Sequence, residues 1–397
     1  EAALGFPIEI VAGREEARLI YLGVSHGLPP SAEKRLVVDI GGGSTEFIIG
    51  TGLQPQCMES LYMGCVSYSQ RYFADGKISK GALRQAEIAA RAEVQAIAGE
   101  FSAGHWQQAI GSSGTAKALS EILQMNSFSD GGITAEGLAK LREAMLRAGD
   151  CNKLQLAGLR PDRVPVLAGG FAIMAAIFAE LDITSMSASD SALREGVLFD
   201  LLGRYTSHDM RETTVQQFMR RYQVDAKQAQ RVEQLGMGLL RQLAGDQPLD
   251  LDAALQRLSW AARLHEIGLS IAHGGYHKHS AYIVENADMP GFSKKEQSQL
   301  ARLVLAQRGS LNKAVQLLPE PDAEFWGQVL ALRLAVLFYR SRMDFALPEI
   351  QLGWHGSSFE IVLSNDWLSR NALTETALEN EVREWKNIGM KLELAKR

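Results

Sequence analysis

The residues best suited to carry chemistry form one short stretch, Asp39-Ile-Gly-Gly-Gly-Ser-Thr-Glu46. Consecutive glycines let the backbone turn several N–H groups toward an anion, and the neighbouring hydroxyls add donors. A carboxylate on each side, from Asp39 and Glu46, suits Mg²⁺ held partly through water. A plain β-turn with flanking acids has a similar composition, but acids on both sides together with Ser-Thr favour a phosphate and magnesium site. The phosphate-binding candidates here are Gly41, Gly42, Gly43 and Ser44.

The elements that must position this stretch are predicted on each side of it. Apolar runs at residues 36–40 and 47–49 have strand length and strand composition, and each is bounded by glycine. We therefore expect a hairpin with a turn rich in glycine and hydroxyl groups.

A second glycine-rich turn follows a strand predicted at residues 107–110 and precedes a helix predicted from Thr115. Such a turn at a helix N-terminus binds anions through backbone N–H groups, aided by the helix dipole. An N-cap with a flexible turn explains the same residues equally well. The candidates in this turn are Gly111, Ser112, Ser113, Gly114 and Thr115.

Two acids lie in the first turn of a helix predicted over residues 14–23. Glu15 and Glu16 there complement the helix dipole, and Glu15 has Arg18 one turn further on as an ion-pair partner. By residue type alone, this structural role is favoured over a catalytic one.

Strands and helices alternate through residues 1–205, which predicts an α/β fold with a ligand at the glycine-rich strand ends. A helix tail is expected at residues 1–5, and residues 162–180 are expected to form a strand, a Gly169-Gly170 turn and an apolar helix. The other predicted strands span residues 7–11, 60–66 and 185–189. The other predicted helices span residues 79–101, 134–148 (with Thr134 as N-cap) and 191–205.

Beyond Thr206, long helical patterns replace the glycine-rich strand ends, at residues 211–242, 253–270, 293–307 and 323–342. This predicts an all-helical second domain. A hairpin across His355-Gly356 and a helix at residues 375–391 predict a small C-terminal α+β domain.

Four histidines of the helical part raise the question of a metal site. Glu266 follows the first of them, at a place where a His-Asp metal site has aspartate, so structural histidines are favoured over metal ligands. A weaker alternative is a positive surface for a polyanion, made with Lys278, Lys294 and Lys295. The histidines are His265, His273, His277 and His279.

Composition excludes several classes of protein. The net charge of −5 gives no general basic character, which argues against a nucleic-acid partner. The three cysteines lack paired spacing, which favours a reducing, cytoplasmic environment. No run of about 18 apolar residues predicts a membrane span, and the N-terminal residues do not resemble a signal peptide.

As a set, five motifs resemble the exopolyphosphatase/guanosine pentaphosphate phosphohydrolase family, in its long proteobacterial form. The resemblance covers essentially the whole chain, and it continues in the helical part from His265 to Phe292. The motifs are Gly13-Arg-Glu-Glu-Ala-Arg-Leu-Ile20, Asp39–Glu46, Met63-Gly-Cys-Val66, Gly111–Thr115 and Ala192-Leu-Arg-Glu-Gly-Val197.

This resemblance implies the actin-like ATPase fold shared by sugar kinases, Hsp70 and actin, and Mg²⁺-dependent removal of a terminal phosphate by water. It implies that Glu16 is the catalytic base, that Asp39 and Glu46 hold the metal, and that Arg163 contacts phosphate. The helical domain would be HD-like without metal chemistry, and the protein a homodimer. The expected domains are residues 1–27, 28–205, 206–345 and 346–397.

One departure from the family is expected to matter. The family's first lobe begins with an Asp-x-Gly-Ser-Asn-Ser phosphate loop, which this sequence lacks. We therefore expect residues 1–27 to supply only the last strand and helix of that lobe, and this polypeptide by itself to have weak or no activity.

Several functions stay open at this point. Exopolyphosphatase is favoured, with guanosine pentaphosphate as the alternative substrate; residues 21–24 and 71–75 lean toward the nucleotide, and residues 39–46 and 277–282 toward polyphosphate. A non-catalytic phosphate or nucleotide sensor is a further alternative. A sugar or acetate kinase is less favoured, because no acceptor site is distinguishable.

Overall fold

The computed structural model describes residues 5, 8–205, 209–245, 250–316, 323–355 and 358–397. The chain divides into two compact units, Val11–Met210 and Arg211–Arg397, the latter with Glu1–Ile10. The helix tail predicted at residues 1–5 lies outside the described residues except for Gly5. The four-domain division stays a prediction.

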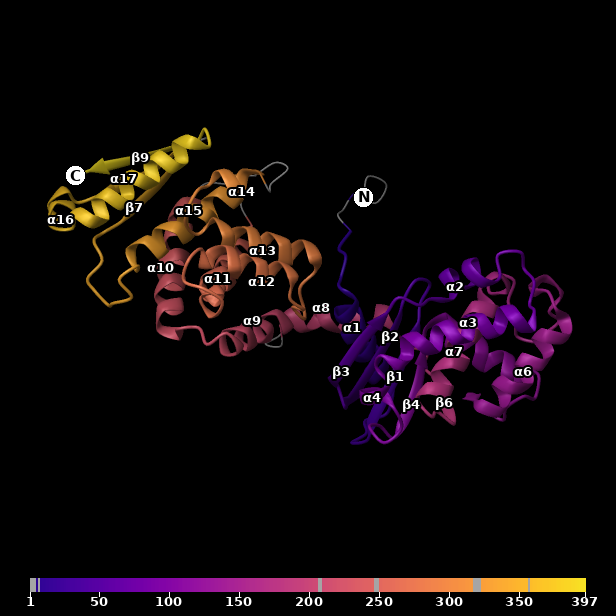
Figure 1. Cartoon of the computed structure of the whole chain (residues 1–397). Helices are drawn as coiled ribbons and strands as arrows, with labels where there is room; N and C mark the ends of the chain where they lie inside the picture. Colours follow the sequence, from indigo (N-terminus) through magenta and orange to yellow (C-terminus); the bar gives the residue numbers. More distant parts are fainter. Residues whose placement is uncertain (1–4, 6–7, 206–208, 246–249, 317–322, 356–357) are drawn as a thin grey trace. The chain divides into compact units, whose positions relative to one another are not determined.

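The first unit contains a six-stranded sheet in the order β3-β2-β1-β4-β6-β5 (Figure 1). The β1–β2 and β2–β3 pairs are antiparallel, whereas β4 is parallel to both β1 and β6. The predicted hairpin around residues 41–44 is thereby confirmed. The strands are β1 (Lys34–Ile40), β2 (Thr45–Thr51), β3 (Gln54–Leu61), β4 (Gln108–Ser112), β5 (Ile133–Thr134) and β6 (Ser185–Ala188).

Helices cover both faces of this sheet. One face packs against α1 through a small apolar cluster, and the other belongs to a larger core shared with helices between α2 and α7. Helices α3 and α7 run side by side over the sheet (Figure 1). The helices are α1 (Gly13–His26), α2 (Cys65–Tyr72), α3 (Lys80–Gln95), α4 (Ala98–Phe101), α5 (Ser113–Met125), α6 (Ala135–Ala148), η1 (Cys151–Lys153), α7 (Val164–Glu180) and α8 (Leu193–Tyr205).

The strand predicted just before Gly169 is wrong, because α7 is one continuous helix from Val164. An apolar run buried on all sides has the same composition in a strand and in a core helix, so periodicity cannot separate them. The two glycines serve close packing instead of a turn. A Cβ on Gly169 would lie 2.5 Å from the carbonyl oxygen of Cys65, and one on Gly170 would lie 2.6 Å from Cγ2 of Thr115.

Two other strand predictions are also wrong. The strand expected at residues 60–66 is β3, which ends at Leu61, because Gly64 and Cys65 begin α2. Residues 8–11 form no strand, since a strand needs a neighbour for its backbone hydrogen bonds and none of the described strands pairs with them.

The helix expected from Thr115 begins earlier, at Ser113. The predicted Thr134 cap is confirmed, with its hydroxyl accepting from the Gly137 N–H at 3.0 Å.

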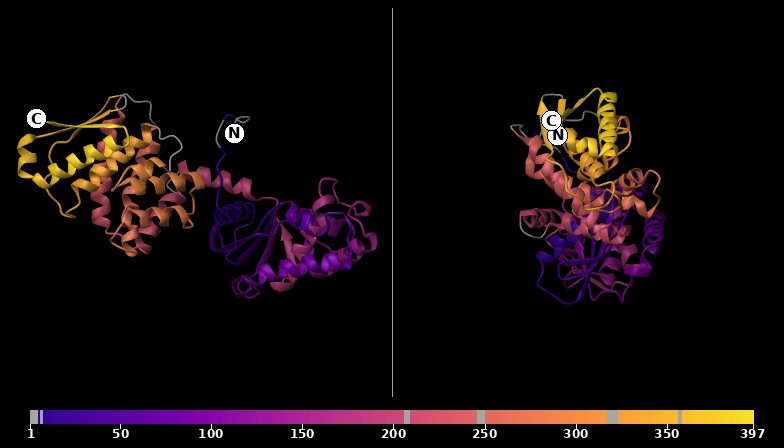
Figure 2. Two further views of the ribbon diagram at one scale, coloured as in Figure 1. Left: turned by 45° about the horizontal axis from the view of Figure 1, so that its top comes forward. Right: turned by 90° about the vertical axis from the view of Figure 1, so that its left-hand side faces the viewer.

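The second unit consists of helices around one apolar core, followed by a three-stranded sheet in the order β7-β8-β9 with α17 packed on it (Figure 2). The predicted helical architecture and the predicted C-terminal α+β architecture are therefore both confirmed. The turn predicted at His355-Gly356 falls partly outside the described residues. The elements are α9 (Met210–Arg221), α10 (Ala226–Ala244), α11 (Leu251–Leu264), η2 (Ile267–Ser270), α12 (Tyr276–Asn286), α13 (Lys294–Ala306), α14 (Asn312–Gln316), α15 (Ala323–Phe338), β7 (Gln351–His355), β8 (Ser358–Leu363), α16 (Asn365–Arg370), α17 (Ala372–Asn387) and β9 (Lys391–Lys396).

No helix in the described part of the chain has both the length and the apolar character needed to cross a bilayer.

Candidate active site

Four polar residues form a row across the sheet of the first unit. Glu46 pairs with Ser60 on one side and with Asp39 on the other, and Asp39 pairs with Ser112 of β4. Residues opposite one another in a ladder point to the same face of the sheet. The two carboxylates therefore lie between two serines at one end of the strands.

This row lies on the face that α1 covers. Two residues earlier along β1, Val37 pairs with Ile48 and Ile110, and all three pack against the apolar side of α1. Because side chains alternate along a strand, Asp39 belongs to the same face as Val37. Asp39 and Glu46 thus extend the α1 interface beyond its apolar part, and each is at most 5% exposed.

The N-terminal turn of α1 lies against the same row. A Cβ on Gly13 would lie 2.7 Å from the Ser60 hydroxyl oxygen, which shows how closely the helix approaches β3. Ser60 donates a hydrogen bond to Glu46 at 2.9 Å. Glu16, one turn into α1, is half-buried and close enough to affect the pKa of both sheet carboxylates.

The pKa values of the three carboxylates are all raised. Burial, together with the charge of Glu16, raises the pKa of Asp39 to about 6, although hydrogen bonds from Ser112 and Ser113 oppose the shift. Burial raises the pKa of Glu46 to about 7, with Ser44 and Ser60 opposing and the other two acids adding to the shift. Burial also raises the pKa of Glu16. Clustered acids with raised pKa values are typical of catalytic or metal sites.

In the first glycine-rich loop, the carbonyl groups are used by α2, whereas several backbone N–H groups are not used by the described part of the protein. The carbonyls of Gly41 and Gly42 accept from the first N–H groups of α2, at 2.9 Å from Cys65 and 3.0 Å from Val66. Within the described residues, the N–H groups of residues 42–44 have no protein acceptor. They are therefore available to an anion.

The second loop approaches the first from β4. Thr115 donates its hydroxyl to the carbonyl of Ile40 at 3.0 Å, which ties α5 to the end of β1. Ser113 has a φ of +70°, a conformation that is uncommon for serine and frequent at functional sites. The Arg163 guanidinium lies over Gly114, where a Cβ would come within 2.4 Å of Nη2.

The thirteen predicted site residues do not all have the same place in this arrangement. Gly111 lies inside β4, where a Cβ would meet Ala116 at 2.7 Å, and Thr115 is used for packing and for its bond to Ile40. The other predicted residues either form the two loops and the carboxylate row or, like Glu16 and Arg163, lie next to them. Sequence reasoning missed Ser60, because only the β2–β3 register brings it opposite Glu46.

An ion network also fixes the orientation of α1. Arg18 donates to both oxygens of Glu15, at 2.8 and 2.7 Å, which confirms the predicted pair, and it also binds Asp200 of α8 at 2.5 Å. Both Glu15 and Arg18 are buried. The neighbouring acids of α1 therefore differ: Glu15 is structurally paired, and Glu16 faces the carboxylate row.

The donor set fits Mg²⁺ in its usual mode. No group of three His, Cys, Asp or Glu side chains in the described ranges is arranged to hold a metal ion. Mg²⁺ does not need one, because it is commonly bound by one or two carboxylates, water and substrate phosphates. Asp39 and Glu46, with serine hydroxyls beside them, supply such an all-oxygen set.

The histidines of the helical unit lie elsewhere. His265 is fully buried, with Nδ1 2.6 Å from the carbonyl oxygen of Ala262, and burial lowers its pKa. Glu266 pairs with Arg342 through both of its oxygens, at 2.7 and 2.9 Å.

Glycine-rich loops, buried carboxylates and an arginine at one end of a mixed sheet are typical of α/β proteins that bind phosphate. Comparison with known proteins gives the family. The model of the Ppx/GppA phosphatase family matches residues 1–205, and that of Ppx/GppA phosphatase domain III matches residues 210–382. The chain belongs to the Ppx/GppA phosphatase family, with its actin-like sheet, helical domain III and small C-terminal sheet.

Solved structures of similar proteins match about half of this chain. An exopolyphosphatase-like protein is 24% identical over 52% of this chain and 71% of its own, with a TM-score of 0.45. An exopolyphosphatase from Cytophaga hutchinsonii is 22% identical over 50% of this chain and 66% of its own, with a TM-score of 0.44. The Aquifex aeolicus Ppx/GppA phosphatase, type II variant, is also 22% identical, with the same coverage and a TM-score of 0.42. The family assignment rests on the family models.

Proposed function

We propose that this protein is a Mg²⁺-dependent phosphoanhydride hydrolase that releases orthophosphate from the ends of polyphosphate chains. The observation that carries the proposal is the group of three acids, Glu16, Asp39 and Glu46, beside two loops suited to phosphate; burial raises all three pKa values, and the charge of Glu16 adds to the shift at Asp39 and Glu46. Family membership supports phosphatase chemistry in general.

Glu16 is the base in this proposal. It orients the attacking water and accepts its proton as the water oxygen bonds to the terminal phosphorus. The bridging P–O bond breaks, and the shortened chain leaves with the bridging oxygen. The raised pKa of Glu16 suits this role, because a base works best when its pKa lies closer to the working pH.

The remaining residues bind and neutralise the phosphates. The N–H groups of residues 42–44 and the Arg163 guanidinium contact the oxygens of the transferred group, since phosphoryl transfer depends mainly on positioning and charge neutralisation. Asp39 and Glu46 hold Mg²⁺, which supplies further neutralisation of phosphate charge when bound. Ser60 and Ser112 orient these two carboxylates.

The choice of polyphosphate rests on residues 39–46 and 277–282, and guanosine pentaphosphate is the competing substrate. The test is to supply the full-length protein with each substrate and Mg²⁺ and to compare kcat/KM. A larger value for guanosine pentaphosphate would reverse the assignment. No turnover of either substrate, with binding intact, would favour the sensor alternative.

Glu16→Gln tests the chemical step itself. Its phosphate release should fall by at least about a hundredfold, the usual contribution of a general base, with substrate binding largely kept. Glu136→Gln is the matched control, because Glu136 also lies in the first turn of a helix but is exposed. Unchanged turnover in Glu16→Gln would remove Glu16 from the mechanism.

Two further properties belong to the same proposal. Cys57, Cys65 and Cys151 are all free thiols, which supports a reducing compartment such as the cytoplasm. We expect a homodimer, as the family resemblance implies, and light scattering at micromolar concentration measures it directly.

A further inference from the structure

The helical unit contains a cavity of about 430 Å³ that the proposed hydrolysis does not use. Its walls come from α10, α12, α15 and α17 and from the segments that follow α11, α13 and α15. Among the described residues that line it are four arginines but only two acids, Glu266 and Glu381. This local excess of positive charge contrasts with the net charge of −5 for the whole chain.

Two of the four arginines form bidentate ion pairs with carboxylates. Arg333 donates to both oxygens of Glu381 at 2.7 Å, and its other N–H groups bind backbone carbonyls. Arg342 neutralises Glu266 with two hydrogen bonds and also lies 3.3 Å from Asp225. Glu266, which stands where a His-Asp metal site has aspartate, therefore has a guanidinium as its partner, and the cavity is not a cation site.

The other two arginines, Arg308 and Arg340, form no ion pair with an acidic side chain in the part of the chain that the structure describes. The Arg308 guanidinium carbon lies 5.1 Å from the centre of the Tyr276 ring. Arg340 donates a long hydrogen bond to the hydroxyl of Thr374, at 3.5 Å. Guanidinium groups with spare donors facing one cavity are suited to phosphate, which they bind through paired N–H groups.

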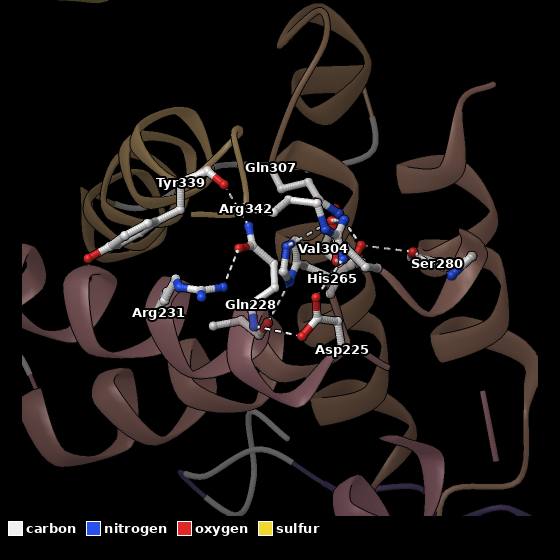
Figure 3. Close-up of polar contacts among 12 residues, drawn as sticks. Asp225, Gln228, Arg231, His265, Ser280, Val304, Gln307, Tyr339 and Arg342 are labelled. Carbon is white, nitrogen blue, oxygen red and sulfur yellow. Dashed lines mark hydrogen bonds and ion pairs between the residues drawn. The ribbon is translucent and has the colours of Figure 1, made fainter. Parts of the chain in front are cut away.

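A buried amide adds an acceptor at the same wall. Gln307 is 2% exposed, and its Nε2 donates to the carbonyls of His265, at 2.6 Å, and Val304, at 3.0 Å (Figure 3). These two bonds fix the orientation of the amide. Its Oε1 is buried without a partner among the described residues, and a buried acceptor without a donor costs free energy. A hydroxyl group or a water carried in with a ligand would satisfy it.

We propose that this cavity is a second, non-catalytic site that binds a small organic phosphate, either a nucleotide or a sugar phosphate. Its phosphate contacts Arg308 and Arg340, a hydroxyl of its sugar is directed toward Gln307, and its body lies on the half-buried side chains of Leu269 and Val336. A cavity of this size suits a ligand of nucleotide dimensions. All lining residues belong to the helical unit, and none of them belongs to the Asp39–Glu46 row.

Calorimetric titration of the full-length protein in EDTA tests the proposal, with AMP and ribose 5-phosphate as probes. Adenosine and inorganic phosphate are the controls for each half of the ligand. The variant Arg308→Gln/Arg340→Gln removes the proposed phosphate contacts. Arg220→Gln/Arg221→Gln makes the same charge change at exposed positions outside the cavity. Thermal unfolding of each variant confirms that it is folded.

We expect at least one organic phosphate to bind more tightly than adenosine or inorganic phosphate. The cavity variant should weaken this binding by at least about tenfold, as the loss of charged hydrogen bonds predicts, while the control variant and Asp39→Asn leave it unchanged. Binding of AMP alone identifies a nucleotide site, and equal binding of both probes identifies a sugar phosphate site. Failure of both probes to bind below about 1 mM, equal binding by the cavity variant, loss in Asp39→Asn, or equally tight binding of inorganic phosphate would each overturn the proposal.

Discussion

Asp39 and Glu46 lie directly opposite one another in the β1–β2 ladder, both buried, with Glu16 as a third negative neighbour. Like charges placed opposite one another destabilise a sheet. Folding alone would not favour this arrangement, whereas a bound cation would make it favourable. The pair is therefore the clearest functional mark in the α/β unit.

Asp39→Asn should increase stability while it reduces function. Burial raises the pKa of Asp39 from 3.8 to about 6, so its ionised form is disfavoured in the folded protein, and at pH 8, above both values, the substitution should stabilise the metal-free protein by up to about 3 kcal/mol. Calorimetry in EDTA measures this gain. Mg²⁺ should stabilise the wild type more than the variant.

Asp130→Asn is the control for this prediction, since Asp130 is an exposed loop residue. Equal or lower stability of Asp39→Asn in EDTA, relative to the wild type, would contradict the electrostatic account of the pair.

Gly114→Ala should reduce activity through Arg163. The added Cβ would lie 2.4–2.7 Å from three atoms of the guanidinium, which must move away. We expect kcat/KM to fall about tenfold, the worth of one charged hydrogen bond, with little change in stability because the guanidinium is the end of a flexible side chain.

A double-mutant cycle separates this effect from general damage to the loop. If Arg163 carries the effect, Gly114→Ala should cause no further loss in an Arg163→Gln background. Additive losses would show that Gly114 matters for another reason.

Gly196→Ala should separate α1 from α8. A Cβ on Gly196 would lie 1.8 Å from the Leu19 carbonyl oxygen, an approach that only glycine permits. We expect destabilisation of about 1–3 kcal/mol or more, measured by urea unfolding, together with loss of activity because α1 carries Glu16.

Gly238→Ala is the matched comparison in α10, where a Cβ meets nothing within 4 Å. This variant should be more stable by about 0.5–1 kcal/mol, because alanine is the better helix former. The close-packing account fails if both substitutions change stability in the same direction.

Glu212→Gln should destabilise the helical unit at neutral pH and less in acid. Arg263 donates to both oxygens of Glu212 at 2.6 Å and lowers its pKa to about 2. A carboxylate with a lowered pKa stabilises the folded state at pH values above its ordinary pKa of 4.5. That contribution is lost as the pH falls toward 2.

The expected difference from wild type at pH 7 is on the order of 1 kcal/mol, since solvent screens a carboxylate that is 41% exposed. Urea unfolding at pH 7 and pH 3 measures it, with the exposed Glu285→Gln as control. A difference of constant size between the two pH values would show that packing, and not charge, stabilises this contact.

Several features follow from local signals in the sequence. The hairpin around residues 41–44 was predictable because two apolar runs separated by so short a turn have little choice but to pair. The Thr134 cap and the Glu15–Arg18 pair were predictable for the same reason, since each depends on residues within one turn of helix. The change to an all-helical second unit followed from periodicity over long segments.

Tertiary packing decided features that local signals do not specify. The apolar run of α7 is a helix and not a strand because it is surrounded by α2, α3 and the sheet. Register brought Ser60 and Ser112 into line with the carboxylates, and close packing placed Arg163 over Gly114. The sequence by itself determined which residues are candidates for phosphate chemistry, because their types and short spacing indicate it. Only the tertiary structure decided their partners, because residues far apart in the chain meet only when strands pair and helices pack.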